Sequence, residues 1–412
     1  MEAKPITIDQ WRASSIAGNG VIGSVFYAFP AGEQNHSLHS LPIPDPFELV
    51  AAASGVLSPI SLFIACAILF LFRPILLELG SALRLNGANY TYLLQFSGKT
   101  LGFFGAAATL LDAMATSTVS SATAAAYLAG EVSNLGVPHA VLAMGVLVGL
   151  CLIGFFQVKE SSTVTLTFTM VHVSVSRPGF SSSSTDTFAP KFLSMAILFT
   201  FSIAAWSKEG TSILAANWEQ RPSNVGRAIF NGVCIGFLGV TGFECTPAYI
   251  EVIRPKDYSR VIRNLLWAAM VLNVPLMLFV YAHLPGEVIL SGANVLSLLA
   301  EKVAGRWLRI LLVIDASLVL AGGVLTGLFT ACGLLQTLAQ DGVLPKLLLR
   351  TIPVTGGPAF TVIFFILGCF TLYASSTFSL SIISSVFSVS FLVVMFLVGL
   401  FRGVLVQYLC RL

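Results

Sequence analysis

Charged residues are scarce in this chain. Only 10% of its 412 residues are Asp, Glu, Lys or Arg, whereas 56% are hydrophobic, and the mean hydropathy is +0.87. About a quarter of the residues in a soluble domain are charged, so this chain lacks the polar surface that a soluble core of this length requires. Its net charge of +3 is small and scattered along the chain, which argues against a nucleic-acid partner.

The residue patterns of metal sites, ATP-binding sites and channel filters are also missing. The seven cysteines form no CxxC pair, and the five histidines form no cluster of metal-ligand type apart from His36 and His39. The absence of a Walker sequence excludes an ATP-driven pump, and no filter motif of a channel is present. A membrane enzyme would need paired catalytic groups on its loops. We therefore expect neither an enzyme nor a bound metal or cofactor.

Long apolar runs are what the chain has instead. Ten of them approach the ~20 residues that an α-helix needs to cross a bilayer. The expected spans are residues 13–30, 56–79, 103–129, 138–158, 163–206 with an interruption, 230–252, 264–283, 307–338, 358–374 and 378–401. Residues 287–306 have the pattern of an amphipathic surface helix rather than a span. These runs predict an all-α polytopic membrane protein embedded in the lipid bilayer.

The basic residues between the spans predict the orientation of the chain. Most lysines and arginines fall in segments that share a side with the N-terminus, which places that side in the cytoplasm. Residues 1–12 are then a cytoplasmic N-terminus and residues 402–412 a short tail. The ten spans divide into two groups of five, over residues 13–206 and 207–401.

The sixth expected span combines features that a lipid-facing helix avoids. Gly239 and Gly242 lie close together, and two glycines weaken a helix. Glu244 follows them, and an ionisable residue at membrane depth is costly and usually functional. A broken helix in a bilayer is tolerated where its freed backbone groups line a cavity or are buried in protein. Because such helices form the substrate sites of many secondary transporters, we predict a break at Thr241 and Gly242 and a transport function.

The first expected span is also rich in glycine. Gly18, Gly20 and Gly23 match the GxGxxG fingerprint of dinucleotide sites, but the strand that this site requires does not precede them. Two interpretations remain. The glycines unwind the span and leave free N–H groups that bind a carboxylate, or they let another helix pack closely. Interruptions at corresponding places in two halves indicate inverted repeats with a site at the middle of the membrane.

Six motifs in order along the chain resemble the amino acid–polyamine–organocation superfamily, and within it the fungal-type amino acid permeases. They read GVIGS at 20–24, RPILLELG at 73–80, NGANY at 86–90, KESSTV at 159–164, GVTGFE at 239–244 and DGVLP at 341–345. The resemblance implies two inverted five-helix repeats with discontinuous first and sixth helices. It also implies a symporter that moves amino acids by alternating access.

The resemblance further implies where the substrate binds. The expected substrate-binding residues are Val21, Ile22, Gly23, Ser24, Val25, Thr241, Gly242, Phe243 and Glu244. The substrate carboxylate would meet the N–H groups around Gly23, Ser24 and Val25. The ammonium would meet the carbonyl groups around Val21, Thr241 and Gly242, while Phe243 would line the side-chain pocket or act as a gate. Many relatives have glycine in place of Val25; a valine narrows access to the backbone, which is compatible with a small or unusual substrate.

Proton coupling is expected, with sodium as the less favoured ion. His172 lies where proton-coupled relatives place a lysine that replaces a sodium ion, and histidine exchanges protons near neutral pH. Asp112 and Glu244 are the other candidates, because both are acids at membrane depth. A neutral ring bonded to a backbone carbonyl is an equally open interpretation of His172, as is a structural, hydrogen-bonded acid for Asp112.

Three features depart from the pattern of the superfamily. Residues 32–49 and 176–191 read as unusual inserts, and the second interrupts the fifth span with a serine-rich tract, which should damage coupling and stability. The chain stops at Leu412, whereas relatives usually add two helices, so we expect a truncated C-terminus. The alternatives are a non-transporting amino-acid receptor of the same fold and a transporter of polyamines or other amines. The plasma membrane is favoured over vacuolar or other internal membranes, and the sequence specifies neither the amino acid nor the oligomeric state.

Overall fold

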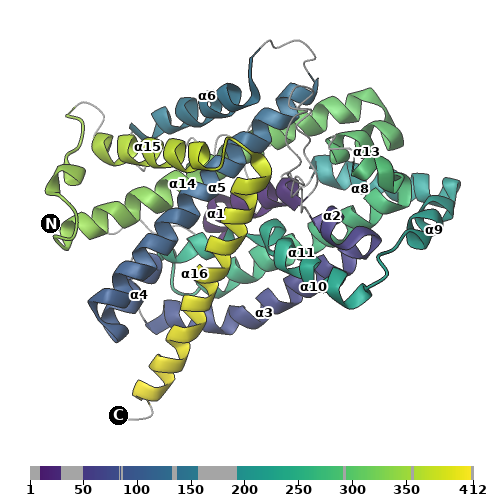
Figure 1. Ribbon diagram of the computed structural model, residues 1–412. Coiled ribbons are helices and arrows are strands. Elements are labelled where there is room, and N and C mark those ends of the chain that lie inside the picture. The colour runs from purple at the N-terminus through teal and green to yellow at the C-terminus, as the bar shows by residue number, and fades with distance from the viewer. Residues whose placement is uncertain are drawn as a thin grey trace, which may run out of the picture.

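All described elements of the protein are helices, as the apolar runs predict (Figure 1). The computed structural model describes residues 10–28, 50–82, 84, 87–131, 137–155, 193–290, 294–353 and 357–409. In the first half, with η for a 3₁₀ helix, the elements are α1 (Gln10–Ala28), α2 (Val50–Ser54), η1 (Gly55–Leu57), α3 (Ser58–Ala82), α4 (Ala88–Ser97), α5 (Lys99–Glu131), α6 (His139–Cys151), η2 (Leu152–Phe155) and α8 (Leu193–Glu209).

The second half has the same all-helical character. Its described elements are α9 (Ser212–Glu219), α10 (Val225–Gly236), η4 (Phe237–Val240), η5 (Phe243–Val252), α11 (Tyr258–His283), α12 (Gly286–Ile289), α13 (Val295–Ala304), α14 (Arg306–Gln340), η6 (Lys346–Leu349), α15 (Ala359–Ser375) and α16 (Leu380–Leu409). Each expected span corresponds to one or more of these helices. The expected fifth span is described only from Leu193 onward, so His172 and both expected inserts lie outside the described residues.

The described helices have the length and apolar composition that are typical of a membrane protein. Four are long and apolar enough to cross a bilayer: Val50–Ala82, Tyr258–His283, Arg306–Gln340 and Leu380–Leu400. Three shorter apolar helical segments accompany them, His139–Phe155, Val225–Val240 and Ala359–Ser375. Many large apolar side chains are exposed on these helices, which is the surface that lipid covers in an integral membrane protein.

Helix α1 lies at the centre of the bundle. It contacts α11, α14, η4 and η5, which come from the second half of the chain (Figure 1). Helix α16 crosses in front of α5 and α1, and α6 lies beside α15 at one edge of the bundle. The first expected span therefore packs mainly against elements from the second half of the chain, on both sides of the predicted helix break.

The predicted break in the first span is wrong. Helix α1 runs without interruption from Gln10 to Ala28, so the N–H groups of its glycine-rich segment lie inside a regular helix. At Gly20 the structure favours the other interpretation, close packing of a neighbouring segment. A Cβ on Gly20 would lie 3.1 Å from the Cα of Gly242, so the two backbones touch at this point. Of the two spans expected to be broken, the described residues show a break in the sixth alone.

Small residues also bring α5 and α14 together beside α1. A Cβ on Gly327 would lie 2.2 Å from the hydroxyl of Ser117, and one on Gly323 would lie 2.7 Å from that of Ser120. The Ser117 hydroxyl donates a hydrogen bond to the carbonyl of Val324 at 2.9 Å. Close helix contact through small residues is typical of membrane bundles, because backbones can then approach each other. This packing fixes the wall of α5 that carries Asp112.

Candidate functional site

The break in the sixth span lies where the glycines predict it. Helix α10 tightens into η4, and Thr241 then adopts an extended conformation with φ −77° and ψ 168°. Gly242 follows at φ +111°, in the region that favours glycine, and η5 starts at Phe243. The prediction of a discontinuous sixth helix is therefore confirmed.

The break rests directly on the backbone of α1. A Cβ on Gly242 would lie 2.5 Å from the amide nitrogen of Val21 and 2.6 Å from the carbonyl carbon of Gly20. A side chain at position 242 would therefore be strained by its φ and would also overlap α1. The two segments expected to bind substrate are thus in contact, although more than 200 residues separate them.

The carbonyl of Gly239, next to the break, is satisfied by two side chains from other helices. The hydroxyl of Ser24 lies 2.9 Å from this oxygen and 2.8 Å from the carbonyl oxygen of Val21. The amide group of Asn273, on α11, donates to the Gly239 carbonyl at 2.7 Å and to the Ala269 carbonyl at 3.0 Å. A buried carbonyl without a partner is costly in a bilayer, so these contacts stabilise the broken conformation.

Asn273 is a site residue that sequence reasoning missed. It is fully buried, and its Oδ1 has no hydrogen-bond partner among the described residues. A buried amide oxygen of this kind is an acceptor for an ammonium group or a water molecule. The sequence signal is weak: Asn273 is the one polar residue in the middle of the expected span 264–283, whose ends carry Asn264 and His283.

Glu244 folds back onto the break. Both oxygens of its carboxyl group accept from the N–H of Gly242, at 2.8 Å and 2.7 Å, and the thiol of Cys245 lies 3.9 Å from Oε1. The side chain is buried. In this conformation Glu244 satisfies a backbone N–H group that the break leaves free, much as a capping residue satisfies the first amides of a helix.

Asp112 faces the same region from α5. It is buried, its Oδ1 accepts from the Ser390 hydroxyl of α16 at 3.4 Å, and its carboxyl group interacts electrostatically with that of Glu244. Tyr27 of α1, which is hydrogen-bonded to Ser120, interacts with Glu244 as well. The structure therefore brings two of the three expected proton-coupling residues together. The third, His172, lies outside the described residues.

The aromatic residue at the break is packed rather than open. Phe243 is only 1% exposed and meets Phe391 of α16 edge to face, with ring centroids 6.1 Å apart. Phe391 also contacts Phe237 at 6.3 Å. This arrangement closes one side of the break in the present conformation.

The remaining expected residues of the first span are buried within α1. Val21, Ile22 and Val25 are at most 3% exposed. A Cβ on Gly23 would lie 3.5 Å from the hydroxyl of Tyr27, so Tyr27 occupies the space beside that glycine. The amides expected to bind the substrate carboxylate thus lie within a regular helix here.

A small cavity lies beside the break, between the α10–η4 segment and α16. Its volume is about 210 Å³, and its lining includes Cys234, Leu238, Ser384 and Ser388. The lining carries hydroxyl and apolar groups but no carboxylate or basic side chain. Within the described residues, no group of three or more His, Cys, Asp or Glu is placed to hold a metal ion.

Comparison with known proteins agrees with the geometry. The family model described as amino acid permease matches residues 8–176 and 180–406, which is nearly the whole chain and includes both sides of the break. A search of curated proteins gave no match. A match of this extent, together with a bundle of apolar helices, shows that the protein is an integral membrane protein. The chain belongs to the amino acid permease family.

Proposed function

We propose that the protein is a secondary transporter that moves an amino acid across the membrane by alternating access. Its core would consist of two inverted five-helix repeats, residues 13–206 and 207–401. The observation that carries this proposal is the contact between Gly20 of α1 and Gly242 at the break. A broken helix seated against a second glycine-rich helix is where secondary transporters hold their substrates.

The substrate would bind at the break in two parts. Its ammonium group would lie near the carbonyl of Thr241, the Oδ1 of Asn273 and the acids Asp112 and Glu244. Its carboxylate would take the amide N–H of Gly242 at the start of η5, which in the present conformation donates to Glu244. Free amides at a helix start favour an anion.

Glu244 gives a route for proton coupling. In the present conformation its carboxylate accepts from the Gly242 amide, at 2.8 Å and 2.7 Å. A protonated carboxyl group is a weaker acceptor, so protonation of Glu244 would release this N–H for the carboxylate of the substrate. Asp112, which interacts with Glu244, would take the proton or balance the ammonium. His172 remains a second proton carrier in this proposal.

An amine transporter is the second candidate. Asp112 and Glu244 are two buried acids in one region. They would also suit a substrate with a positive charge and no carboxylate, because a nearby positive charge stabilises the ionised form of a buried acid. A receptor that binds an amino acid without moving it has the same site. The three functions can be separated by measuring uptake into sealed vesicles: an amino acid transporter takes up amino acids, an amine transporter takes up amines, and a receptor takes up neither.

The test is a substrate panel with purified protein in proteoliposomes. Radiolabelled amino acids and amines are compared at two pH values, with and without sodium, and each uptake is set beside equilibrium binding. We expect uptake of an amino acid that rises with an inward proton gradient and does not need sodium. Uptake of amines alone would support the second candidate, and binding without uptake would support a receptor. Expression in a eukaryotic cell would show whether the protein reaches the plasma membrane.

A further inference from the structure

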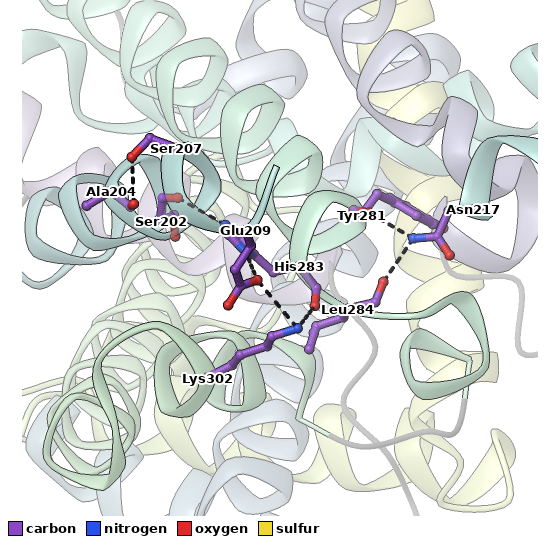
Figure 2. A network of polar contacts seen from close by, with 9 residues as sticks. All are labelled: Ser202, Ala204, Ser207, Glu209, Asn217, Tyr281, His283, Leu284 and Lys302. Atoms are coloured by element: carbon purple, nitrogen blue, oxygen red, sulfur yellow. Dashed lines mark hydrogen bonds and ion pairs between the residues drawn. The ribbon is translucent and has the colours of Figure 1, made fainter. Parts of the chain in front are cut away.

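A buried histidine lies at the end of α11, far along the helix from Asn273. His283 is the last residue of α11, and its side chain is 0% exposed. It meets the C-terminal end of α8 and the short helix α13 (Figure 2). The charge bias predicts that this end of the bundle faces outward.

Both nitrogens of the His283 ring face oxygen acceptors. Nε2 lies 3.0 Å from the carbonyl oxygen of Ser202, and Nδ1 lies 3.4 Å from Oε2 of Glu209; both partners belong to α8 (Figure 2). A carbonyl oxygen and a carboxylate oxygen only accept hydrogen bonds, and a neutral imidazole has only one N–H. The arrangement is therefore satisfied by an imidazolium, which donates from both nitrogens.

Lys302 of α13 completes the cluster. Its ammonium donates to the backbone carbonyl of His283 and lies 3.8 Å from Oε2 of Glu209. Glu209 is 44% exposed and Lys302 33%, so water reaches the cluster although the ring itself is covered. Glu209 from α8 and Lys302 from α13 are the charged groups facing His283 among the described residues.

The end of α11 is held separately by a neutral side chain. Asn217 of α9 donates to the carbonyls of Tyr281 and Leu284, at 2.8 Å and 2.9 Å (Figure 2). It also accepts from the N–H of Gly286 at 2.8 Å. None of these bonds changes with pH near neutrality. Loss of a proton from His283 would therefore loosen the contact with α8 and leave the end of α11 in place.

We propose that His283 is a proton-binding site that fastens α8 to α11 and α13 when the medium on that side is acidic. Protonated, the ring donates to Ser202 and to Glu209. Deprotonated, it keeps one of these bonds, and an unshared electron pair then faces either the carbonyl or the carboxylate. The site is distinct from Asp112 and Glu244 at the break. Its effect on transport rests on the proposed function: external acid would tighten the outer end of the fifth and seventh spans.

Thermal unfolding of the full chain in lipid nanodiscs tests the site without any transport. His283→Gln keeps a donor for Ser202 but has no proton to gain or lose. From about pH 8 to about pH 6 we expect the melting temperature of the parent to gain about 2 °C relative to this variant, the effect of one charge-assisted hydrogen bond. The matched control is His139→Gln, because Nε2 of His139 also faces a backbone carbonyl, that of Ala122, at 3.1 Å.

Glu209→Gln gives a second, independent result. The amide of glutamine can donate to Nδ1 of the neutral ring, so this variant should lose the pH-dependent gain. Nitrogen NMR of labelled histidine in the parent should show both ring nitrogens of His283 protonated at about pH 6. A parent and a His283→Gln variant with the same pH dependence, or a ring that stays singly protonated, would overturn the proposal. Neither readout involves transport, so they separate this inference from the proposed function.

Discussion

Replacing Gly242 with alanine tests the contact between the break and α1 directly, because it adds a single methyl group at the point of contact. The position combines two constraints that rarely coincide. Its φ of +111° disfavours any side chain, and a Cβ there would overlap the backbone of Gly20 and Val21, at 2.5 to 2.6 Å for the nearest atoms. The overlapping atoms are main-chain atoms of α1, so no side-chain rotation relieves the contact.

The size of the effect follows from these two constraints. A left-handed conformation costs an alanine about 1–2 kcal/mol, and forcing an extra carbon into a packed contact costs about 1–3 kcal/mol. Together they lower the free energy of unfolding by about 2–5 kcal/mol. With an unfolding entropy of about 2 cal/mol/K per residue, the melting temperature falls by about 2–6 °C. Uptake should fall as well, because α1 and the break would separate.

Three glycines provide controls that separate the two constraints. Gly210 has φ +75° with nothing within 4 Å of a Cβ, so Gly210→Ala isolates the backbone strain. Gly20 is helical but its Cβ would lie 3.1 Å from Gly242, so Gly20→Ala isolates the contact. Gly333 is helical with open space around it, so Gly333→Ala should raise stability by about 0.5–1 kcal/mol.

The assay is thermal unfolding of the purified variants in one lipid nanodisc preparation, with uptake measured in parallel. We expect Gly242→Ala to be the least stable, Gly210→Ala and Gly20→Ala to be intermediate, and Gly333→Ala to equal or exceed the parent. A Gly242→Ala variant that melts with the parent and transports normally would refute the close contact between α1 and the break.

Three further substitutions test other contacts of the site. Glu244→Gln removes the proton exchange proposed here, so acid stimulation of uptake should vanish while exchange of internal for external substrate survives; stimulation equal to the parent assigns coupling elsewhere. Asn273→Leu removes a partner of the Gly239 carbonyl and should lower the free energy of unfolding by about 1–3 kcal/mol; an unchanged denaturation curve would contradict this role. Arg84 donates to the carbonyl of Ile250 at 2.9 Å, so Arg84→Met should speed amide exchange at the end of η5, measured by mass spectrometry; equal exchange would show that this contact does not hold η5.

The helices and the broken sixth span could be predicted because their signals are local. Apolar runs of spanning length predict helices, and the Gly239, Gly242 and Glu244 pattern predicts a break within one segment. The structure has that break at Thr241 and Gly242. The pattern of residues 287–306 predicts a helix between the spans, and α12 and α13 are short helices in this part of the chain.

The conformation of α1 could not be predicted because its cause lies elsewhere in the chain. A glycine that unwinds a helix and one that lets a neighbour approach have the same sequence pattern. The distinction at Gly20 depends on Gly242, which packs against it from a distant segment. The roles of Asn273 and His283 could not be predicted either, because each is an isolated polar residue whose hydrogen-bond partners come from other helices.

Accumulation of substrate against its gradient tests the central claim most directly. Proteoliposomes with equal internal and external amino acid are given an inward proton gradient, and internal radiolabel is followed with and without a protonophore. The account predicts a transient rise of internal amino acid above the external concentration, abolished by the protonophore and absent in Glu244→Gln. An internal concentration that never exceeds the external one, in liposomes where the parent binds the same amino acid, would contradict it.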